Sequence, residues 1–125
     1  METWKVLIVD DELEFTSALA ERLALRGMDA RTAVSGEEAL QILESDPPQV
    51  VVSDVMMPGV GGMELLKRIK AGYPKVQVIL LTGMSCAFDS EKGERLGAFR
   101  CLMKPLNINE LIKTISEAIA VVAEP

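Results

Sequence analysis

Five polar residues that can bind a metal ion or a phosphate lie where short apolar runs of this sequence end. Asp10 and Asp11 follow the first run, Asp54 the second, Thr82 the third and Lys104 the fourth. If the runs are parallel strands of one sheet, their carboxyl ends share one edge, and open α/β sheets bind ligands at that edge. The sequence therefore predicts that three carboxylates, a hydroxyl group and an ammonium group converge.

The chemistry that these groups allow together is metal-assisted phosphoryl transfer. Carboxylates gathered at one place raise one another's pKa unless a cation compensates, and a small site with oxygen ligands favours Mg²⁺. The hydroxyl group of Thr82 and the ammonium group of Lys104 can each contact a phosphoryl oxygen. An aspartate oxygen is a sufficient nucleophile for this transfer, so the predicted product is an aspartyl phosphate.

Each of the five residues also has an ordinary structural explanation. The Asp10-Asp11 pair and Thr82 could cap helices, Asp54 could be a turn residue, and Lys104 could be a solvated side chain. Such roles do not explain why all five stand at the ends of apolar runs. The sequence contains no histidine, which excludes an imidazole base, a histidine zinc ligand and a phosphohistidine carried on this chain.

The elements that must position these residues alternate as five pairs of strand and helix. The apolar patterns predict strands at residues 6–9, 28–34, 49–54, 76–81 and 98–103, and helices at 13–26, 35–46, 63–71, 85–96 and 108–122. The expected fold is therefore α/β, a doubly wound, five-stranded parallel sheet flanked by five helices. Ser35, with Glu38 three residues on, and Asn107 are expected helix caps. Low local stability is expected at 85–96, which contains Gly93 and few large apolar residues.

Length and composition limit the class of protein. The chain has 125 residues and a net charge of −6, so we expect one domain over residues 1–125, no output domain and no direct binding of nucleic acid. Its apolar runs are shorter than a membrane span, and its N-terminus lacks the features of a signal peptide. Cys86 and Cys101 have no metal-binding spacing and are expected to be thiols. A cytoplasmic protein without membrane contact is expected.

Four stretches, residues 6–12, 51–59, 80–83 and 97–105, carry the five polar residues within longer motifs. In these stretches the chain resembles the receiver domains of two-component response regulators, and the resemblance covers essentially its whole length. It implies a flavodoxin- and CheY-like (βα)5 fold and a phosphorylation-activated signalling switch. The donor would be a sensor histidine kinase, a phosphotransfer protein or a small phosphodonor. The chain would act as an enzyme only in catalysing its own phosphorylation and dephosphorylation.

The resemblance also implies roles for the acidic residues. Asp54 would be the phosphoacceptor. Mg²⁺ would be bound by Asp11, Asp54 and the backbone carbonyl of Met56. Asp10 would act on the metal ion through a water molecule.

The last two strands would hold the phosphoryl group and report its presence. The resemblance implies that Thr82 and Lys104 contact this group and that the peptide bond from Lys104 to Pro105 is cis. In the family the threonine works with an aromatic residue on the fifth strand, but Cys101 stands there in this chain. A thiol cannot swing a ring toward Thr82, so the usual aromatic response is not expected. The change would spread to the face of the fourth helix, fifth strand and fifth helix, which would control an unidentified partner or output.

Further differences from the family concern the surface of the fifth strand. Strand alternation places Phe99 on the face of Cys101, where it would either form an exposed apolar patch for a partner or pack under the fourth helix. Many relatives pair acidic residues of this strand with an arginine of the last helix across a two-fold axis. This chain has Phe99-Arg100 and Thr114 at those positions, so such a charged dimer is not expected.

Two methionines are expected to flank the phosphoryl group. Met56 and Met84 stand where the family often has polar residues that help or admit the attacking water. Their apolar side chains would shield an acyl phosphate, so slow autodephosphorylation is expected.

Three rival interpretations differ in what the sequence must supply. A haloacid-dehalogenase-type phosphatase needs its two acids separated by one residue, whereas Asp10 and Asp11 are adjacent. A flavodoxin-like cofactor binder needs a first loop that binds phosphate, and the acidic run at 10–12 would repel phosphate. A degenerate receiver, acting as a phosphorylation-independent protein-interaction module, is the alternative of another class, because Cys101 replaces the aromatic residue.

Overall fold

The computed structural model describes residues 3–83, 93 and 95–123. In this part of the chain five strands form one parallel sheet in the order β2-β1-β3-β4-β5. The elements are β1 (Lys5–Val9), α1 (Leu13–Ala24), β2 (Asp29–Ala33), α2 (Gly36–Ser45), β3 (Val50–Asp54), α3 (Gly62–Gly72), β4 (Gln77–Thr82), β5 (Arg100–Met103) and α5 (Ile108–Ala123). The predicted fold class is confirmed, while the helix predicted at 85–96 falls largely outside the described residues.

Among the described helices, none has both the length and the apolar character that crossing a membrane requires.

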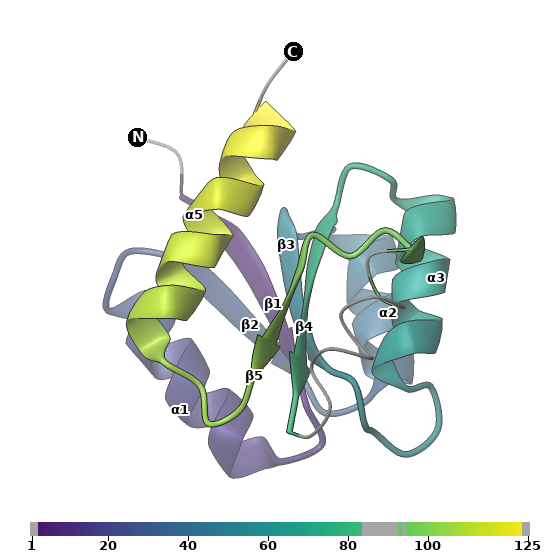
Figure 1. The fold of residues 1–125 in the computed structure, drawn as a ribbon, viewed down its shortest axis with the longest axis horizontal. Coiled ribbons are helices and arrows are strands. Elements are labelled where there is room, and N and C mark those ends of the chain that lie inside the picture. The colour runs from purple at the N-terminus through teal and green to yellow at the C-terminus, as the bar shows by residue number, and fades with distance from the viewer. Residues whose placement is uncertain (1–2, 84–92, 94, 124–125) are drawn as a thin grey trace.

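Two hydrophobic cores lie on opposite faces of the sheet, because successive side chains of a strand point to opposite sides. α1 and α5 cover one face, and α2 and α3 cover the other (Figure 1). The α1–α5 core joins strand residues such as Ile8 to Leu23 of α1 and Ile115 of α5. The α2–α3 core joins strand residues such as Leu7 to Leu66 of α3. The central strands are buried on both sides, which explains their almost continuous apolar sequences.

The strand register places the carboxyl ends of β1, β3, β4 and β5 together, and we call this end of the sheet the carboxyl edge. Val9 of β1 pairs with Ser53 of β3, and Thr82 of β4 pairs with Met103 of β5. Each of the five polar residues identified from the sequence either ends a strand or follows one within two positions. The fold therefore brings them to the edge that the sequence predicts.

Side-chain caps fix where two of the helices begin, as predicted. Ser35 Oγ accepts a hydrogen bond from the backbone N–H of Glu38 at 3.1 Å. Asn107 Oδ1 accepts hydrogen bonds from the N–H groups of Asn109 and Glu110 at 2.9 and 3.1 Å. These bonds satisfy N–H groups that the first turn of a helix leaves unpaired.

The prediction that Phe99 shares a face with Cys101 is wrong, while the alternative of packing under the fourth helix concerns residues that lie largely outside the described part of the chain. β5 begins at Arg100 rather than at residue 98, so Phe99 precedes the regular pleat of the strand. It packs, partly buried, against the α1–α5 core, whereas Cys101 packs against the α2–α3 core. The Arg100 guanidinium carbon lies 5.2 Å from the centroid of the Phe99 ring, and Arg100 also forms an ion pair with Glu117 of α5. Phe99 therefore neither shares a face with Cys101 nor stands fully exposed.

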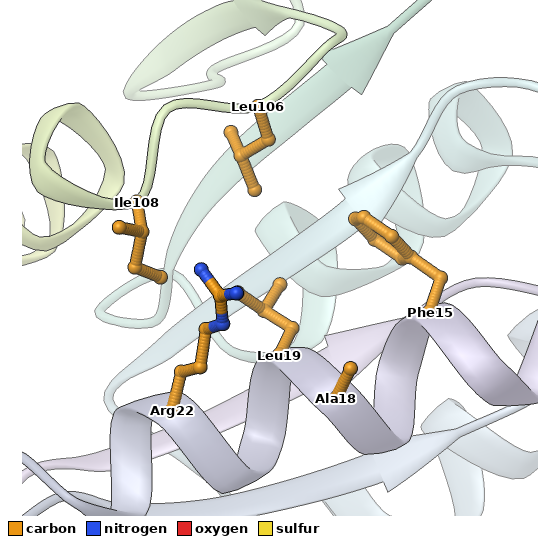
Figure 2. A pocket seen from close by; sticks show the side chains of 6 residues that line it. All are labelled: Phe15, Ala18, Leu19, Arg22, Leu106 and Ile108. Carbon is orange, nitrogen blue, oxygen red and sulfur yellow. The ribbon is translucent and has the colours of Figure 1, made fainter.

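A groove lies between α1 and the segment that joins β5 to α5. Its lining comprises Phe15, Ala18, Leu19, Arg22, Leu106 and Ile108. Figure 2 shows the side chains of α1 directed toward Leu106 and Ile108 across this groove. Phe15 is the third residue of α1, so its end of the groove lies next to the carboxyl edge.

Candidate functional site

Asp10 is fully buried just after β1, and both of its carboxylate oxygens accept hydrogen bonds. Oδ1 accepts one from the backbone N–H of Glu12 at 3.0 Å, and Oδ2 accepts one from Lys104 Nζ at 3.1 Å. The bond to Glu12 is the local turn contact that aspartate makes with the backbone two residues on. The N-cap of α1 is Glu12, so Asp10 is not the helix cap that its place in the sequence also allowed.

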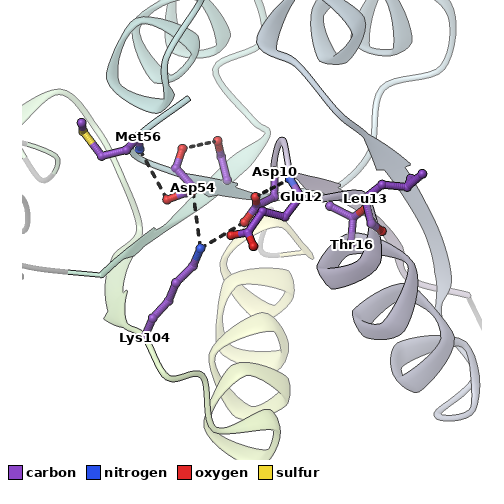
Figure 3. A network of polar contacts seen from close by, with 8 residues as sticks. Asp10, Glu12, Leu13, Thr16, Asp54, Met56 and Lys104 are labelled. Atoms are coloured by element: carbon purple, nitrogen blue, oxygen red, sulfur yellow. Dashed lines mark hydrogen bonds and ion pairs between the residues drawn. The ribbon is translucent and has the colours of Figure 1, made fainter. Parts of the chain in front are cut away.

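Asp54 is the last residue of β3 and is 8% exposed. Its Oδ1 accepts a hydrogen bond from the backbone N–H of Met56 at 3.4 Å, and its Oδ2 lies 3.4 Å from Lys104 Nζ (Figure 3). Burial raises the pKa of the Asp54 carboxyl and the charge of Asp10 adds to the rise, although Lys104 and the Met56 N–H oppose it. Burial and the charge of Asp10 thus both disfavour the ionised form of Asp54, and a cation held among these carboxylates would offset this effect.

Only glycine fits at the first residue of α3, which lies against the backbone of Asp54. A Cβ atom on Gly62 would overlap the carbonyl oxygen of Asp54 and would lie 2.8 Å from the Cα atom of Val55. The N–H of Gly62 also donates to the carbonyl oxygen of Val55 at 3.0 Å. Gly62 therefore positions the end of β3. The glycine pair at the start of α3, Gly61 and Gly62, is the one sign of this in the sequence, and sequence reasoning did not assign it.

Lys104 connects the two buried carboxylates. Its backbone N–H donates to the carbonyl oxygen of Thr82 at 2.8 Å, which places it beside the end of β4. Burial lowers the pKa of the Lys104 ammonium group, but the hydrogen bond and charge of Asp10 and the charge of Asp54 outweigh it, so this pKa is raised overall. Lys104 therefore stays a cation. Thr82 is buried, and the peptide bond from Lys104 to Pro105 is cis.

Three carboxylates at this edge have the donor set that a magnesium ion requires. Asp10, Asp11 and Asp54 each offer one oxygen, and these oxygens all lie within 4.8 Å of one another. Asp11 is exposed, so water can reach the group, and Mg²⁺ usually keeps several water ligands beside one or two carboxylates. The residues present therefore fit Mg²⁺.

The comparison with protein families agrees with this geometry. The sequence model of the family named response regulator receiver domain matches residues 6–116 of the chain. The chain belongs to this family. It is a receiver domain of two-component signalling systems, and receiver domains act as phosphorylation-activated switches.

Relatives of this receiver domain include longer transcriptional regulators. It is 42% identical over 121 residues to the transcriptional regulatory protein CpxR homolog of Haemophilus influenzae. This match covers 97% of the chain and 52% of that protein. It is 36% identical over 120 residues to the DNA-binding transcriptional regulator NtrC of Escherichia coli K12. This match covers 96% of the chain and 26% of that protein. The chain thus spans about half or less of the length of these relatives.

Two solved structures match this chain over nearly their whole length and share its fold. A response regulator receiver domain protein from Clostridium thermocellum is 33% identical with a TM-score of 0.89, and the match covers 94% of each chain. The chemotaxis response regulator CheY4 of Vibrio cholerae is 30% identical with a TM-score of 0.86, covering 94% of this chain and 99% of that one. The whole (βα) arrangement is therefore that of a receiver domain.

Of the other residues that the sequence singles out around the site, the structure describes Met56 and Cys101. Met56 contributes its N–H to Asp54, and the residue is 78% exposed. Cys101 is partly buried and pairs with Leu80 of β4, two residues before Thr82. Met84 and Cys86 lie outside the described residues. The sequence did not point to Phe15, whose ring lies near Lys104, because apolar spacing on α1 indicates only a buried face.

Proposed function

We propose that this receiver domain accepts a phosphoryl group on Asp54. The observation that carries the proposal is that Asp54 alone, of the three clustered carboxylates, combines contact with Lys104 with residual exposure. Asp10 also contacts Lys104, but it is fully buried with a hydrogen bond to each oxygen. Asp11 is exposed at the rim. Asp54 is therefore the carboxylate that a donor can reach while Lys104 stays beside it.

In the proposed reaction a carboxylate oxygen of Asp54 attacks the phosphorus atom of the donor. The bond from phosphorus to the donor nitrogen or oxygen breaks and its electron pair goes to the donor. A nitrogen donor then takes a proton from solvent, whereas an acyl phosphate leaves as its carboxylate. Lys104 Nζ and the hydroxyl group of Thr82 contact the phosphoryl oxygens and offset their charge. Phosphoryl transfer depends mainly on such positioning and charge neutralisation, so no further side-chain base is needed.

Mg²⁺ would be held by Asp11, Asp54 and the backbone carbonyl of Met56, with Asp10 acting through water. The oxygen-only donor set and the exposure of Asp11 support this assignment. When bound, the ion supplies positive charge to the phosphoryl oxygens and to the carboxylates.

We assign the donor to a histidine kinase or a phosphotransfer protein, with small phosphodonors as substitutes. This receiver has no histidine, so a phosphohistidine donor must be another molecule. In this proposal it catalyses only its own phosphorylation and dephosphorylation, in the cytoplasm, and residues 1–125 form the receiver unit. Thr82 and Cys101 would pass the change to the fourth helix, β5 and α5, and so to a downstream partner.

The test is incubation with Mg²⁺ and acetyl phosphate, followed by intact-mass measurement. We expect a mass increase of one phosphoryl group, about 80 Da, in the wild type and none in Asp54→Asn. Asp46→Asn is the matched control, because it removes an aspartate outside the site. If no adduct forms, or if Asp54→Asn forms it equally, the phosphoacceptor assignment is wrong, and an interaction module that works without phosphorylation becomes the better account.

A further inference from the structure

The ammonium group of Lys104 has a third contact, with an aromatic ring. Lys104 Nζ lies 4.9 Å from the centroid of the Phe15 ring. This is within the distance of about 6 Å over which a cation is attracted to the face of a ring. Phe15 is the third residue of α1, just after the turn that carries Asp10 and Asp11. The same end of α1 therefore brings two acidic residues and one neutral ring to the site.

Packing holds the Phe15 ring in place. Phe15 is partly buried against the α1–α5 core, and its ring forms the end of the groove beside Leu106 (Figure 2). Leu19, one helical turn further along α1, is 5% exposed and anchors the same face of the helix. The ring is therefore a fixed part of the fold rather than a side chain that follows the lysine.

The ring differs from the two carboxylates because a metal ion does not compete for it. Asp10 and Asp54 hold Lys104 at 3.1 and 3.4 Å, but both also belong to the group of carboxylates that can hold a cation. A cation that engages these oxygens weakens their attraction for the ammonium group, because like charges then share the same partners. The contact with Phe15 is not shared in this way.

We propose that Phe15 is a positioning residue, which keeps the Lys104 ammonium group beside Asp54 when the carboxylates are engaged by a cation. The inference rests on the proposed contact of Lys104 with the phosphoryl group. A cation–ring contact at a partly exposed site corresponds to a two- to fivefold effect, or about 0.5–1 kcal/mol. The effect on phosphorylation should therefore be modest and should depend on the ring.

The test compares Phe15→Leu and Phe15→Trp with the wild type, using Ile108→Val as a control that trims the same groove elsewhere. The first readout is the NMR resonances of the Lys104 ε-methylene group, measured without metal and with Mg²⁺, since a nearby ring shifts them. The second is the initial rate of phosphorylation by acetyl phosphate with Mg²⁺. We expect Phe15→Leu to move the resonances toward those of a solvated lysine, more so with Mg²⁺, and to slow phosphorylation about two- to fivefold.

Rescue by a ring separates positioning from loss of stability. Phe15→Trp should keep both the displaced resonances and the rate, while Ile108→Val should change neither. Loss of the ring moves the Lys104 resonances by itself, so the deciding quantity is the additional movement caused by Mg²⁺. If Mg²⁺ moves them no further in Phe15→Leu than in the wild type, the inference is wrong, whatever happens to the rate. If the wild type is not phosphorylated at Asp54 at all, the proposed function fails, and the resonances still decide whether Phe15 positions Lys104.

Discussion

Among the described residues, two clusters combine aspartates with basic side chains, and they are built differently. Near the amino ends of β1 and β2, Lys5 Nζ lies 3.0 Å from Asp46 Oδ1, and Arg31 Nη2 lies 2.7 Å from Asp46 Oδ2 and 3.6 Å from Asp29 Oδ2. Each of these four side chains is more than a third exposed. We call this group the amino-end cluster. In this cluster two cationic side chains form ion pairs with two carboxylates, and all four side chains are in contact with water.

The carboxyl edge uses the same residue types with a different balance. Asp10 and Asp54 are buried and share the ammonium group of Lys104, and Asp11 stands beside them. The hydrogen bond from Lys5 holds the pKa of Asp46 below its usual value, and Arg31 contributes despite some opposing desolvation. Burial instead raises the pKa of Asp54. A cluster of carboxylates indicates function when the fold both buries it and leaves part of its charge uncompensated.

Removing the shared cation should have the largest effect, and it should differ sharply between the clusters. Lys104→Met takes away the group that contacts both buried carboxylates, so we expect phosphorylation to slow by about 10²- to 10³-fold. Lys5→Met removes an exposed ion pair, which contributes little to stability and nothing to the site. The initial rate of the mass increase with acetyl phosphate measures both. Equal rates of phosphorylation in the two variants would contradict the proposed difference between the clusters.

The position of Asp54 also depends on a close backbone approach that the amino-end cluster does not use. Gly62→Ala should lower the free energy of unfolding by about 1–3 kcal/mol, because its Cβ meets the backbone of β3. Gly72→Ala is the matched control, since a Cβ there meets nothing within 4 Å, and it should be neutral or slightly stabilising. Urea denaturation measures both variants. A Gly62→Ala protein as stable as the wild type would mean that α3 does not fix Asp54.

An exposed methionine beside the carboxyl edge should slow the loss of the phosphoryl group. Met56→Asn replaces this apolar side chain by one that can hold water, so we expect dephosphorylation several-fold faster than in the wild type. Leu25→Asn, which changes an equally exposed apolar residue at the far end of α1, should leave the decay unchanged. The decay of the phosphorylated mass after donor removal is the measurement. A Met56→Asn protein that decays no faster contradicts the shielding role.

The smallest expected effect is on stability without metal, and its sign should be opposite at the two clusters. The folded state raises the pKa of Asp54, so its contribution to stability is present at low pH and is lost as pH rises. In metal-free buffer, Asp54→Asn should therefore have a higher free energy of unfolding than the wild type at neutral pH. This difference in stability should shrink as pH falls. Asp46 has a lowered pKa, so its contribution is lost as pH falls, and Asp46→Asn should be slightly destabilising at neutral pH. Denaturation at several pH values with a chelator tests this, and changes of the same sign would count against it.

The sequence predicts the sheet and the convergence at its edge because both follow from periodicity. Buried parallel strands read as apolar runs, and polar residues at their carboxyl ends must meet once the runs pair in one sheet. Caps such as Ser35 and Asn107 are also local, since their partners lie within three residues. These features need no knowledge of distant contacts.

What the sequence does not predict depends on contacts between distant segments. The approach of Gly62 to Asp54 and the contact of Phe15 with Lys104 require the packed positions of α3 and α1. The face of Phe99 depends on where β5 begins, because side chains alternate regularly only within the strand and Phe99 lies just before it. Periodicity fixes the order of elements but leaves such boundaries open by a residue or two.

The most direct test of the central claim is an amide NMR titration of the receiver domain with Mg²⁺ followed by acetyl phosphate. The uncompensated carboxylates should bind the cation, so Mg²⁺ should shift amides near Asp10, Asp54 and Lys104 and leave those of the amino-end cluster unchanged. Acetyl phosphate should then move the amides that follow Asp54 to a new set of positions. Shifts of equal size at Asp46, or no shift at the carboxyl edge, would contradict the account.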